Sequence, residues 1–290
     1  MPIKYDIIAI DLDGTLLDGQ GEVSRQNAAA IDLAREAGIE IVLATGRAWV
    51  ESRHAIEAIR QREGVFIGAG GAALNRAVDG ETLWRSVMEP HLIARVAEAL
   101  LSRGHLAHLL KDRHGTGYDY LIVGSGVLDP ASEWWLRTLP VAARYAPTME
   151  GDAHPGDTLR CGTVATADEV AEVAGAIRVQ LGDAIFLQHW PALTEAERTG
   201  APTHMLEVFN PDVDKWTALE RYARQRNVAP ERIAAIGDGI NDARMIRSAG
   251  LGIAMANASP GVAHVAARIT GHHDEHGVAA AIEAILEGRW

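Results

Sequence analysis

The sequence predicts an α/β fold in which a doubly wound parallel sheet is covered by helices and carries an inserted α+β domain. In the first third of the chain, apolar strand-like runs alternate with amphipathic helical runs, and the same alternation returns near the C-terminus. Between these two regions the order of elements changes. Regular alternation of strands and helices is typical of parallel sheets, because parallel strands need long crossover connections.

The first third is expected to form strands at 5–11, 39–45 and 64–70, separated by helices at 24–38 and 49–62. Ser24 is a suitable N-cap for the first helix, and Gly38 is a suitable stop. Near-helical spacing along this helix is shown by Ala28, Ile31, Leu33, Ala34 and Ala37. Apolar residues at this spacing are typical of an amphipathic helix.

The C-terminal region repeats the pattern of the first third. It is expected to form strands at 204–209, 232–238, 250–256 and 267–270, with helices at 215–227 and 243–249. Both ends of the chain are therefore assigned to one Rossmann-like sheet in a single core domain.

The middle of the chain has a different texture. Its expected elements are a helix at 90–104, strands at 105–111 and 118–124, a helical segment at 131–139, a strand at 158–166, a helix at 167–181 and a strand at 183–190. This order suits an α+β unit inserted as a cap into the core. The predicted core domain is 1–83 with 199–290, and the predicted cap domain is 84–198.

Composition excludes several classes of function. A net charge of −12 and the lack of a lysine-arginine block disfavour nucleic acid as a partner. No run of eighteen apolar residues and no cleavable leader is present, so we expect no membrane association and a cytoplasmic location. The single cysteine, Cys161, is expected to be a small buried hydrophobe.

The run DLDGT places two carboxylates directly after the first strand. Ligands of parallel α/β sheets bind at the carboxyl ends of strands, so Asp11 and Asp13 are candidate active-site residues. A carboxylate at Asp11 can attack phosphorus and form an aspartyl-phosphate. A second carboxylate at Asp13 can protonate the leaving oxygen and later deprotonate water. Gly14 allows a tight turn close to the ligand.

Three further positions carry polar residues where a ligand would bind. Thr45, Gly46 and Arg47 follow the second strand, where a hydroxyl and backbone amides can hold phosphate oxygens. Lys215 begins a helix, an electrostatically poor place for a cation that has no anionic partner. The run GDGIND follows a later strand and contains Asp238, Asn241 and Asp242. Three carboxylates with oxygen-only ligation indicate a magnesium site.

With these motifs in order, the chain resembles the haloacid-dehalogenase-superfamily phosphatases, in particular the Cof-type branch with a type IIB cap. The resemblance rests on DLDGTLL, ATGR, Lys215 and GDGIND, and on the closing segments GIAMANA and DEHGVAAAIE. It covers the whole core, but only the order of elements in the cap. It implies a Mg2+-dependent phosphatase acting on a phosphate monoester of a small metabolite, such as a sugar phosphate or a cofactor phosphate.

The resemblance implies a role for each carboxylate. Asp11 would be the nucleophile and, with the main-chain carbonyl of Asp13 and with Asp238, would ligate magnesium. Asp13 would be the general acid and base. Asn241 and Asp242 would support the metal and Lys215, Asp242 through water or from outside direct coordination.

The resemblance also implies the residues that bind the phosphoryl group. Thr45 and Lys215 would bind it and contribute to catalysis. Gly46 and Asn241 would also contact substrate. Arg47 would either reach substrate or pair within the core. The implied partner is a small phosphorylated metabolite, and the protein is expected to be a monomer or a homodimer.

Three departures from the family pattern stand out. Trp216 follows the motif lysine where glycine is usual, and Gly70-Gly71 replaces the usual Asn-Gly. The closing loop reads His272-His273-Asp274-Glu275-His276-Gly277, which would bind zinc through His272 and His276 if it were helical. Two alternative functions stay open: a sugar phosphomutase, and a catalytically idle protein that binds or senses a phosphorylated metabolite.

Overall fold

The computed structural model describes residues 4–191 and 203–290. The chain divides into two compact units. The first, here called the core unit, contains Met1–Trp84 and Asp214–Trp290, and the second, here called the inserted unit, contains Arg85–Val213. Within the described ranges, no helix combines the length and apolarity needed to cross a membrane.

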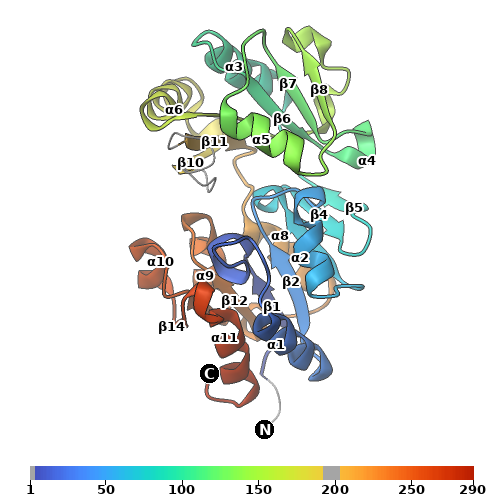
Figure 1. Cartoon of the computed structure of the whole chain (residues 1–290), viewed down its shortest axis with the longest axis vertical. Coiled ribbons are helices and arrows are strands. Elements are labelled where there is room, and N and C mark those ends of the chain that lie inside the picture. Colours follow the sequence, from blue (N-terminus) through green and yellow to red (C-terminus); the bar gives the residue numbers. More distant parts are fainter. Residues whose placement is uncertain (1–3, 192–202) are drawn as a thin grey trace. The chain divides into compact units, whose positions relative to one another are not determined.

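The core unit is built on a sheet of eight strands in the order β14-β13-β12-β1-β2-β3-β4-β5 (Figure 1). The strands are β1 (Ile7–Ile10), β2 (Glu40–Ala44), β3 (Val65–Gly68), β4 (Ala73–Arg76), β5 (Thr82–Arg85), β12 (Ile233–Gly237), β13 (Leu251–Ala254) and β14 (Arg268–Ile269). All pairings from β14 to β3 are parallel, and β4 runs antiparallel to β3. The predicted parallel sheet is confirmed, whereas the short strands β4 and β5 were not predicted.

Helices cover both faces of this sheet. They are α1 (Arg25–Glu36), α2 (Arg53–Ala58), α8 (Lys215–Gln225), α9 (Ala243–Ser248), α10 (Pro260–Val265) and α11 (Gly277–Leu286). Successive strand residues point to opposite faces. Ile8 and Ile10 of β1 accordingly belong to the apolar cluster that includes α1 and α11, which lie side by side (Figure 1). Ile7 and Ala9 belong to the cluster that includes α8, so the doubly wound arrangement is also confirmed.

The capping of α1 follows the sequence prediction, but its buried face differs. The Ser24 hydroxyl accepts a hydrogen bond from the backbone N–H of Asn27 at 3.1 Å, and Gly38 has a φ of +87°. The buried face contains Asn27, Ala30, Ile31 and Ala34, whereas Leu33 is 50% exposed. Leu33 and Ala37 share the near-helical spacing noted in the sequence but lie outside this face, which includes the polar Asn27 instead.

The predicted helix at 49–62 is shorter and divided. A 3₁₀ turn at Val50–Ser52 precedes α2, which ends at Ala58. Arg60 has a φ of +51°, a left-handed conformation that a helix cannot continue through.

The inserted unit has a six-stranded sheet in the order β10-β11-β9-β6-β7-β8. Its strands are β6 (Ala107–Lys111), β7 (Tyr120–Val123), β8 (Ala143–Ala146), β9 (Thr158–Thr166), β10 (Phe186–Pro191) and β11 (Thr203–Phe209). Its helices are α3 (Pro90–Leu101), α4 (Arg113–Thr116), α5 (Pro130–Thr138) and α6 (Ala167–Leu181). Only β7 and β8 pair in parallel among the described strands of this sheet. Residues of α3 and α6 share one apolar cluster with the sheet, and the buried Cys161 belongs to it as expected.

The strand at 203–209 corrects one expectation. We assigned 204–209 to the core sheet, and began the second part of the core domain at 199. The structure pairs β11 antiparallel with β9 and β10 instead, and Leu206 and Val208 lie in the apolar cluster of α3 and α6. The chain therefore returns to the core unit at Asp214. An apolar run of this kind fits either sheet, and only the pairing partner decides between them.

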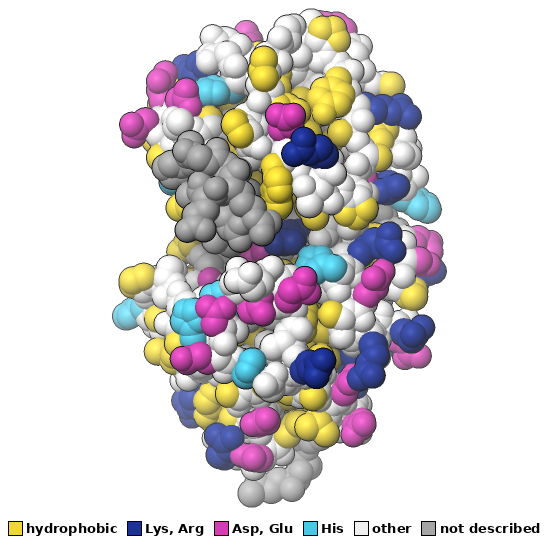
Figure 2. All heavy atoms as spheres, in the orientation of Figure 1, with side chains coloured by type: hydrophobic (Ala, Val, Ile, Leu, Met, Phe, Trp, Pro, Cys, Tyr) yellow, Lys and Arg dark blue, Asp and Glu magenta, His cyan; other side chains and the backbone are white. Residues whose placement is uncertain are grey.

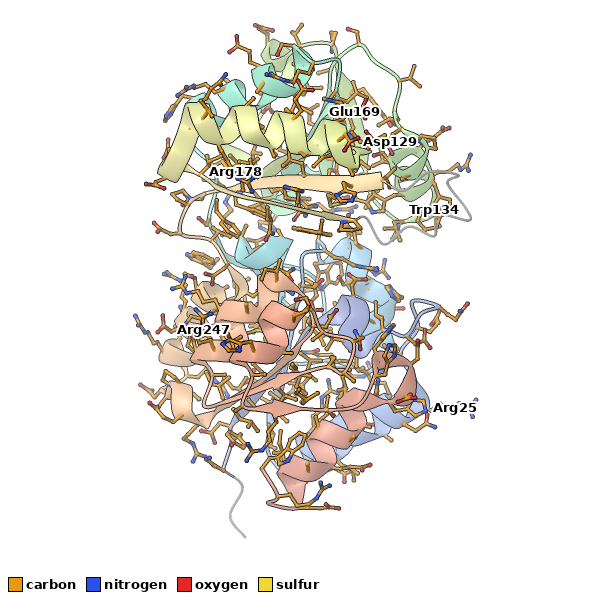
Figure 3. All side chains as sticks on the ribbon, turned by 90° about the vertical axis from the view of Figure 1, so that its left-hand side faces the viewer. Arg25, Asp129, Trp134, Glu169, Arg178 and Arg247 are labelled. Atoms are coloured by element: carbon orange, nitrogen blue, oxygen red, sulfur yellow. The ribbon has the colours of Figure 1, made fainter. Side chains whose placement is uncertain are left out.

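Helix α5 carries the two adjacent tryptophans of the inserted unit. Asp129 caps it by accepting hydrogen bonds from the backbone N–H groups of Ala131 and Ser132, each at 3.0 Å (Figure 3). The Trp135 ring meets Tyr120 edge-on at 4.6 Å between centroids, and Trp134 is half-buried. Aromatic packing therefore joins α5 to β7.

Candidate active site

Three neighbouring strands of the core sheet end in polar side chains. Asp11 follows β1, Thr45 follows β2 and Asp238 follows β12, and these strands run in parallel in the order β12-β1-β2. Parallel strands present their carboxyl ends at one edge, so the three side chains lie at that edge. Lys215, the first residue of α8, joins them, because its Nζ lies 2.5 Å from Asp11 Oδ1.

The backbone turns sharply after Asp11. Gly14 has a φ of +72°, and a Cβ atom at this position would lie 2.5 Å from Asp238 Oδ2. Any other residue here would be strained by the left-handed backbone and would displace the carboxylate of Asp238. Thr15 Oγ1 donates a hydrogen bond to Asp238 Oδ1 at 2.8 Å. The glycine and threonine of DLDGT therefore seat the carboxylate of Asp238 against the turn.

Lys215 is buried between two carboxylates. Its Nζ contacts Asp11 Oδ1 at 2.5 Å and Asp242 Oδ1 at 2.7 Å, and it is only 1% exposed. Burial lowers the pKa of Lys215, but the two carboxylates outweigh it, so the pKa lies above its ordinary value. Lys215 is therefore a permanent ammonium group, and Asp11 and Asp242 are the anionic partners that offset its unfavourable position at a helix start.

Asp242 is held by hydrogen bonds on both carboxylate oxygens. Besides Oδ1 on Lys215, its Oδ2 accepts from the backbone N–H groups of Asp238 at 3.1 Å and Gly239 at 3.0 Å. Asp242 is fully buried at the start of α9. With both oxygens engaged, its carboxylate braces Lys215 and the turn after β12.

The carboxylates outnumber the cations at this point. Single oxygens of Asp11, Asp238 and Asp242 lie within 4.8 Å of one another, beside the single ammonium of Lys215. Three negative charges against one positive charge leave two uncompensated when all are ionised. Burial and the neighbouring Asp242 raise the pKa of Asp11 well above its usual range, with Lys215 opposing them. Burial raises the pKa of Asp238 to about 6. A divalent cation would balance this excess, and the oxygen donors fit Mg2+ or a similar hard ion.

Asp13 and Arg47 form an ion pair beside this cluster. Arg47 Nε donates to Asp13 Oδ2 at 2.9 Å, and its terminal nitrogen contacts Asp13 Oδ1. Burial lowers the pKa of Arg47, but the charge of Asp13 outweighs it and leaves the pKa above the ordinary value. Of the two roles considered for Arg47, pairing within the core unit is the one that this structure contains.

Thr45 and Gly46 lie between β2 and Arg47. Thr45 is 1% exposed, and its Oγ1 accepts from the backbone N–H of Arg47 at 3.2 Å. Its carbonyl accepts from the backbone N–H of Gly70 at 3.0 Å, which joins the turns after β2 and β3. The Thr45 hydroxyl is therefore held beside the backbone of Arg47.

The structure accounts for Trp216, a departure from the family pattern, and for Gly71, the glycine that matches the pattern. Trp216 is buried among apolar residues of β1, β2 and β12, so it packs in the core. Gly71 has a φ of +104°, and a Cβ atom there would lie 2.1 Å from the carbonyl oxygen of Asp214. The turn after β3 therefore touches the start of α8, and Gly71 permits the approach that positions Lys215.

Asn257 is a site residue that sequence reasoning missed. Its Nδ2 donates to the carbonyl of Gly14 at 2.8 Å and lies 3.5 Å from Asp238 Oδ2. Its Oδ1 accepts from the backbone N–H of His273 at 3.1 Å. The signal was its position in GIAMANA just after β13, another strand end. Asn241, which was predicted, is half-buried in the turn at Ile240–Asp242.

Comparison with known proteins agrees with this architecture. A model of the haloacid dehalogenase-like hydrolase family matches residues 8–282. Phosphatase YwpJ of Bacillus subtilis is 27% identical over 300 residues, which cover 97% of this chain and 99% of the relative. The 5-amino-6-(5-phospho-D-ribitylamino)uracil phosphatase YcsE of the same organism is 27% identical over 283 residues, with 97% and 95% covered.

A solved structure extends the likeness to the fold. The haloacid dehalogenase-like hydrolase from Bacteroides thetaiotaomicron superposes with a TM-score of 0.79 at 27% identity. The match covers 97% of this chain and 100% of that protein, so it includes both units.

Proposed function

This chain belongs to the haloacid dehalogenase-like hydrolases and is a phosphatase of that family, and we propose that it hydrolyses a phosphate monoester of a small metabolite through an aspartyl-phosphate. The observation that carries the proposal is the buried contact of Lys215 with Asp11 and Asp242 beside Asp238. It combines a nucleophile, a fixed cation and excess negative charge at one edge of the sheet.

In this proposal Asp11 attacks phosphorus with the oxygen that Lys215 does not hold. Lys215 contacts Oδ1, so Oδ2 is the attacking atom. The bond from phosphorus to the leaving oxygen breaks as the bond to Asp11 forms. Lys215, Thr45, Gly46 and Asn241 bind the phosphoryl oxygens. Every one of these roles is open to substitution experiments.

Asp13 supplies the proton to the leaving oxygen, and then removes a proton from the water that cleaves the aspartyl-phosphate. Both carboxylate oxygens of Asp13 are engaged by Arg47. Arg47 must therefore release Asp13 before Asp13 can act as an acid. We propose that substrate draws Arg47 away, since a phosphate competes well for a guanidinium group.

Asp11, Asp238 and the main-chain carbonyl of Asp13 would hold the divalent cation, which we propose to be Mg2+, with Asp242 supporting them from outside direct coordination. When bound, the cation offsets the charge repulsion between the carboxylate and a phosphate dianion. Three statements stay predictions. The inserted segment 84–198 determines substrate specificity, the protein is cytoplasmic, and it is a monomer or a homodimer.

The test is phosphate release from a panel of phosphorylated metabolites, with and without Mg2+. The panel contains sugar phosphates, cofactor phosphates and the phosphorylated ribitylaminouracil named for one relative. We expect hydrolysis of at least one compound that requires a divalent cation. Formation of an isomeric sugar phosphate without phosphate release would indicate a mutase instead. No turnover of any compound would favour a binding protein.

A further inference from the structure

A second group of metal-binding side chains lies outside the proposed active site. His272, His273 and Asp274 each offer one ligand atom, and these atoms lie within 4.8 Å of one another. They occupy the connection between β14 and α11. Figure 2 shows histidine and acidic side chains on the face of the core unit that is turned to the viewer. Nothing in the proposed phosphatase reaction uses these two imidazoles.

The geometry differs from the zinc pair considered from sequence. Only His273–Glu275 form a single 3₁₀ turn, and α11 begins at Gly277. His276 has a φ of +59°, so His272 and His276 do not lie one turn apart on a helix. The adjacent residue His273 shares the cluster instead.

A hydrogen bond determines which nitrogen of His273 can bind a metal. Its Nδ1 lies 2.9 Å from the carbonyl oxygen of Leu17. A carbonyl oxygen can only accept, so Nδ1 carries the proton and the neutral ring keeps its lone pair on Nε2. Histidine ligands of metals commonly donate their second ring N–H to a carbonyl or carboxylate in this way.

The carboxylate of Asp274 lies near both imidazole rings. His273 Nε2 lies 3.6 Å from Asp274 Oδ2, and His272 Nδ1 lies 3.6 Å from the same oxygen. Ligand atoms of a tetrahedral zinc ion are about 3.3–3.5 Å apart, given bond lengths near 2.0–2.2 Å. Both nitrogen–oxygen separations are therefore within a few tenths of an ångström of those required. Coordination through His272 Nδ1 replaces its 3.2 Å hydrogen bond from the backbone N–H of Asp274.

We propose that His272, His273 and Asp274 bind a transition-metal ion of the zinc class, with water at the open position. Two nitrogen donors distinguish this site from the all-oxygen cluster around Asp11, which suits Mg2+. The site is independent of the phosphatase proposal, since none of its three ligands has a role there.

The site is connected to the turn that follows β1. Asp274 Oδ1 accepts a hydrogen bond from the backbone N–H of Gly19 at 2.7 Å, and His273 donates to the carbonyl of Leu17. A metal that fixes both ligand side chains also restrains this end of the turn. The segment that carries Asp11 and Asp13 would thus be tethered at Leu17 and Gly19.

The test measures metal binding to the full chain, stripped with a chelator and then held in excess Mg2+ to occupy the all-oxygen cluster. Zinc is titrated by equilibrium dialysis. Cobalt(II) is the spectroscopic probe, because a nitrogen-containing tetrahedral site absorbs visible light far more strongly than an octahedral oxygen site. We expect about one bound zinc per chain and the tetrahedral cobalt spectrum.

His273→Asn is the decisive variant. Its side-chain amide can still donate to Leu17, but it lacks the imidazole lone pair. We expect the dissociation constant for zinc to rise at least about tenfold and the cobalt bands to disappear. His276→Asn is the matched control, because asparagine tolerates the left-handed backbone and His276 lies outside the cluster. Melting temperatures in chelator verify that both variants fold.

Three results would overturn the site. The first is the absence of zinc binding in excess Mg2+. The second is equal zinc affinity in His273→Asn and the unchanged protein. The third is loss of binding in Asp238→Asn, which would place the ion among the active-site carboxylates.

Discussion

Two of the described lysines are buried, one in each unit, and their surroundings differ. Lys111 of β6 is 2% exposed, and its Nζ contacts Asp152 Oδ2 at 2.6 Å, Thr158 Oγ1 at 2.7 Å and the carbonyl of His154 at 3.0 Å. Three acceptors satisfy the three ammonium protons, and one carboxylate balances one charge. This arrangement is complete without a ligand.

Lys215 of the core unit has the opposite balance. It contacts two carboxylates, and a third, Asp238, lies beside them. Burial lowers the pKa of Lys111 below its ordinary value, whereas the excess of carboxylates raises that of Lys215. Burial of a charged group therefore does not identify an active site. An uncompensated charge that a ligand would balance is the better indicator.

Replacing aspartate by asparagine should have opposite effects on activity and stability in the Lys215 and Lys111 clusters. In the core unit, Asp11→Asn removes the nucleophile, and an amide is a very poor replacement. We expect kcat to fall at least about ten-thousandfold on any substrate found by the metabolite panel. Stability should stay the same or rise, because one of three crowded carboxylates is neutralised.

The measurements are steady-state phosphate release and thermal unfolding in chelator. Residual activity above about 1% of the unchanged enzyme would rule out Asp11 as the nucleophile. A large loss of stability would instead show that Lys215 needs Asp11 as a structural partner.

In the inserted unit, Asp152→Asn should reduce stability and leave the chemistry intact. It leaves Lys111 as a buried cation without a balancing charge, and we expect this to cost about 3 kcal/mol of stability. This value is at the lower end for such losses, because the asparagine amide oxygen still accepts a hydrogen bond from Lys111. Urea unfolding measures the loss. Activity per folded molecule should stay within about twofold of the unchanged enzyme, and a selective fall in kcat would contradict a purely structural role.

The sequence identified the candidate catalytic residues of the core unit, but not all of the hydrogen bonds that position them. Asp11, Thr45 and Asp238 were found because each follows an apolar strand, and the parallel topology brings strand ends together. Asn257 was missed, since its partner Gly14 lies 243 residues away and no local pattern joins them. Long-range hydrogen bonds of this kind have no periodic signal.

The inserted unit shows the same limit at the level of strands. The run at 204–209 was predicted as a strand but placed in the wrong sheet, because alternation predicts a strand without identifying the strand that it pairs with. The Lys111 cluster was not predicted at all. Its members come from β6, the 149–152 turn and β9, so only the folded chain brings them together.

The charge excess also predicts how stability depends on pH. The pKa of Asp238 is raised to about 6 in the folded protein, above its unfolded value of about 3.9. The folded state therefore binds more protons between these values, and the stability of the metal-free protein should fall as pH rises from about 4 to 6. We expect a loss of about 1–2 kcal/mol across this window after partial relaxation of the site.

Unfolding in chelator at a series of pH values measures this slope. Asp238→Asn should make the slope shallower, with a remainder from Asp11, whose pKa is also raised. Saturating Mg2+ should reduce the slope of the unchanged protein by favouring the ionised carboxylates. A slope that is unchanged in Asp238→Asn would assign the titration to another group.

The smallest expected effects come from one hydroxyl in each cluster. Thr158→Val removes an acceptor from Lys111 and should cost about 1–2 kcal/mol of stability, with no change in the Mg2+ requirement. The hydrogen bond from Thr15 to Asp238 Oδ1 lowers the pKa of that carboxyl, and Thr15→Val removes this bond. Without it Asp238 holds its proton more tightly, so the Mg2+ concentration for half-maximal activity should rise about threefold to tenfold near pH 6. If both variants changed the Mg2+ requirement equally, the difference in charge balance between the Lys111 cluster and the Lys215 cluster would not explain which of them binds the metal.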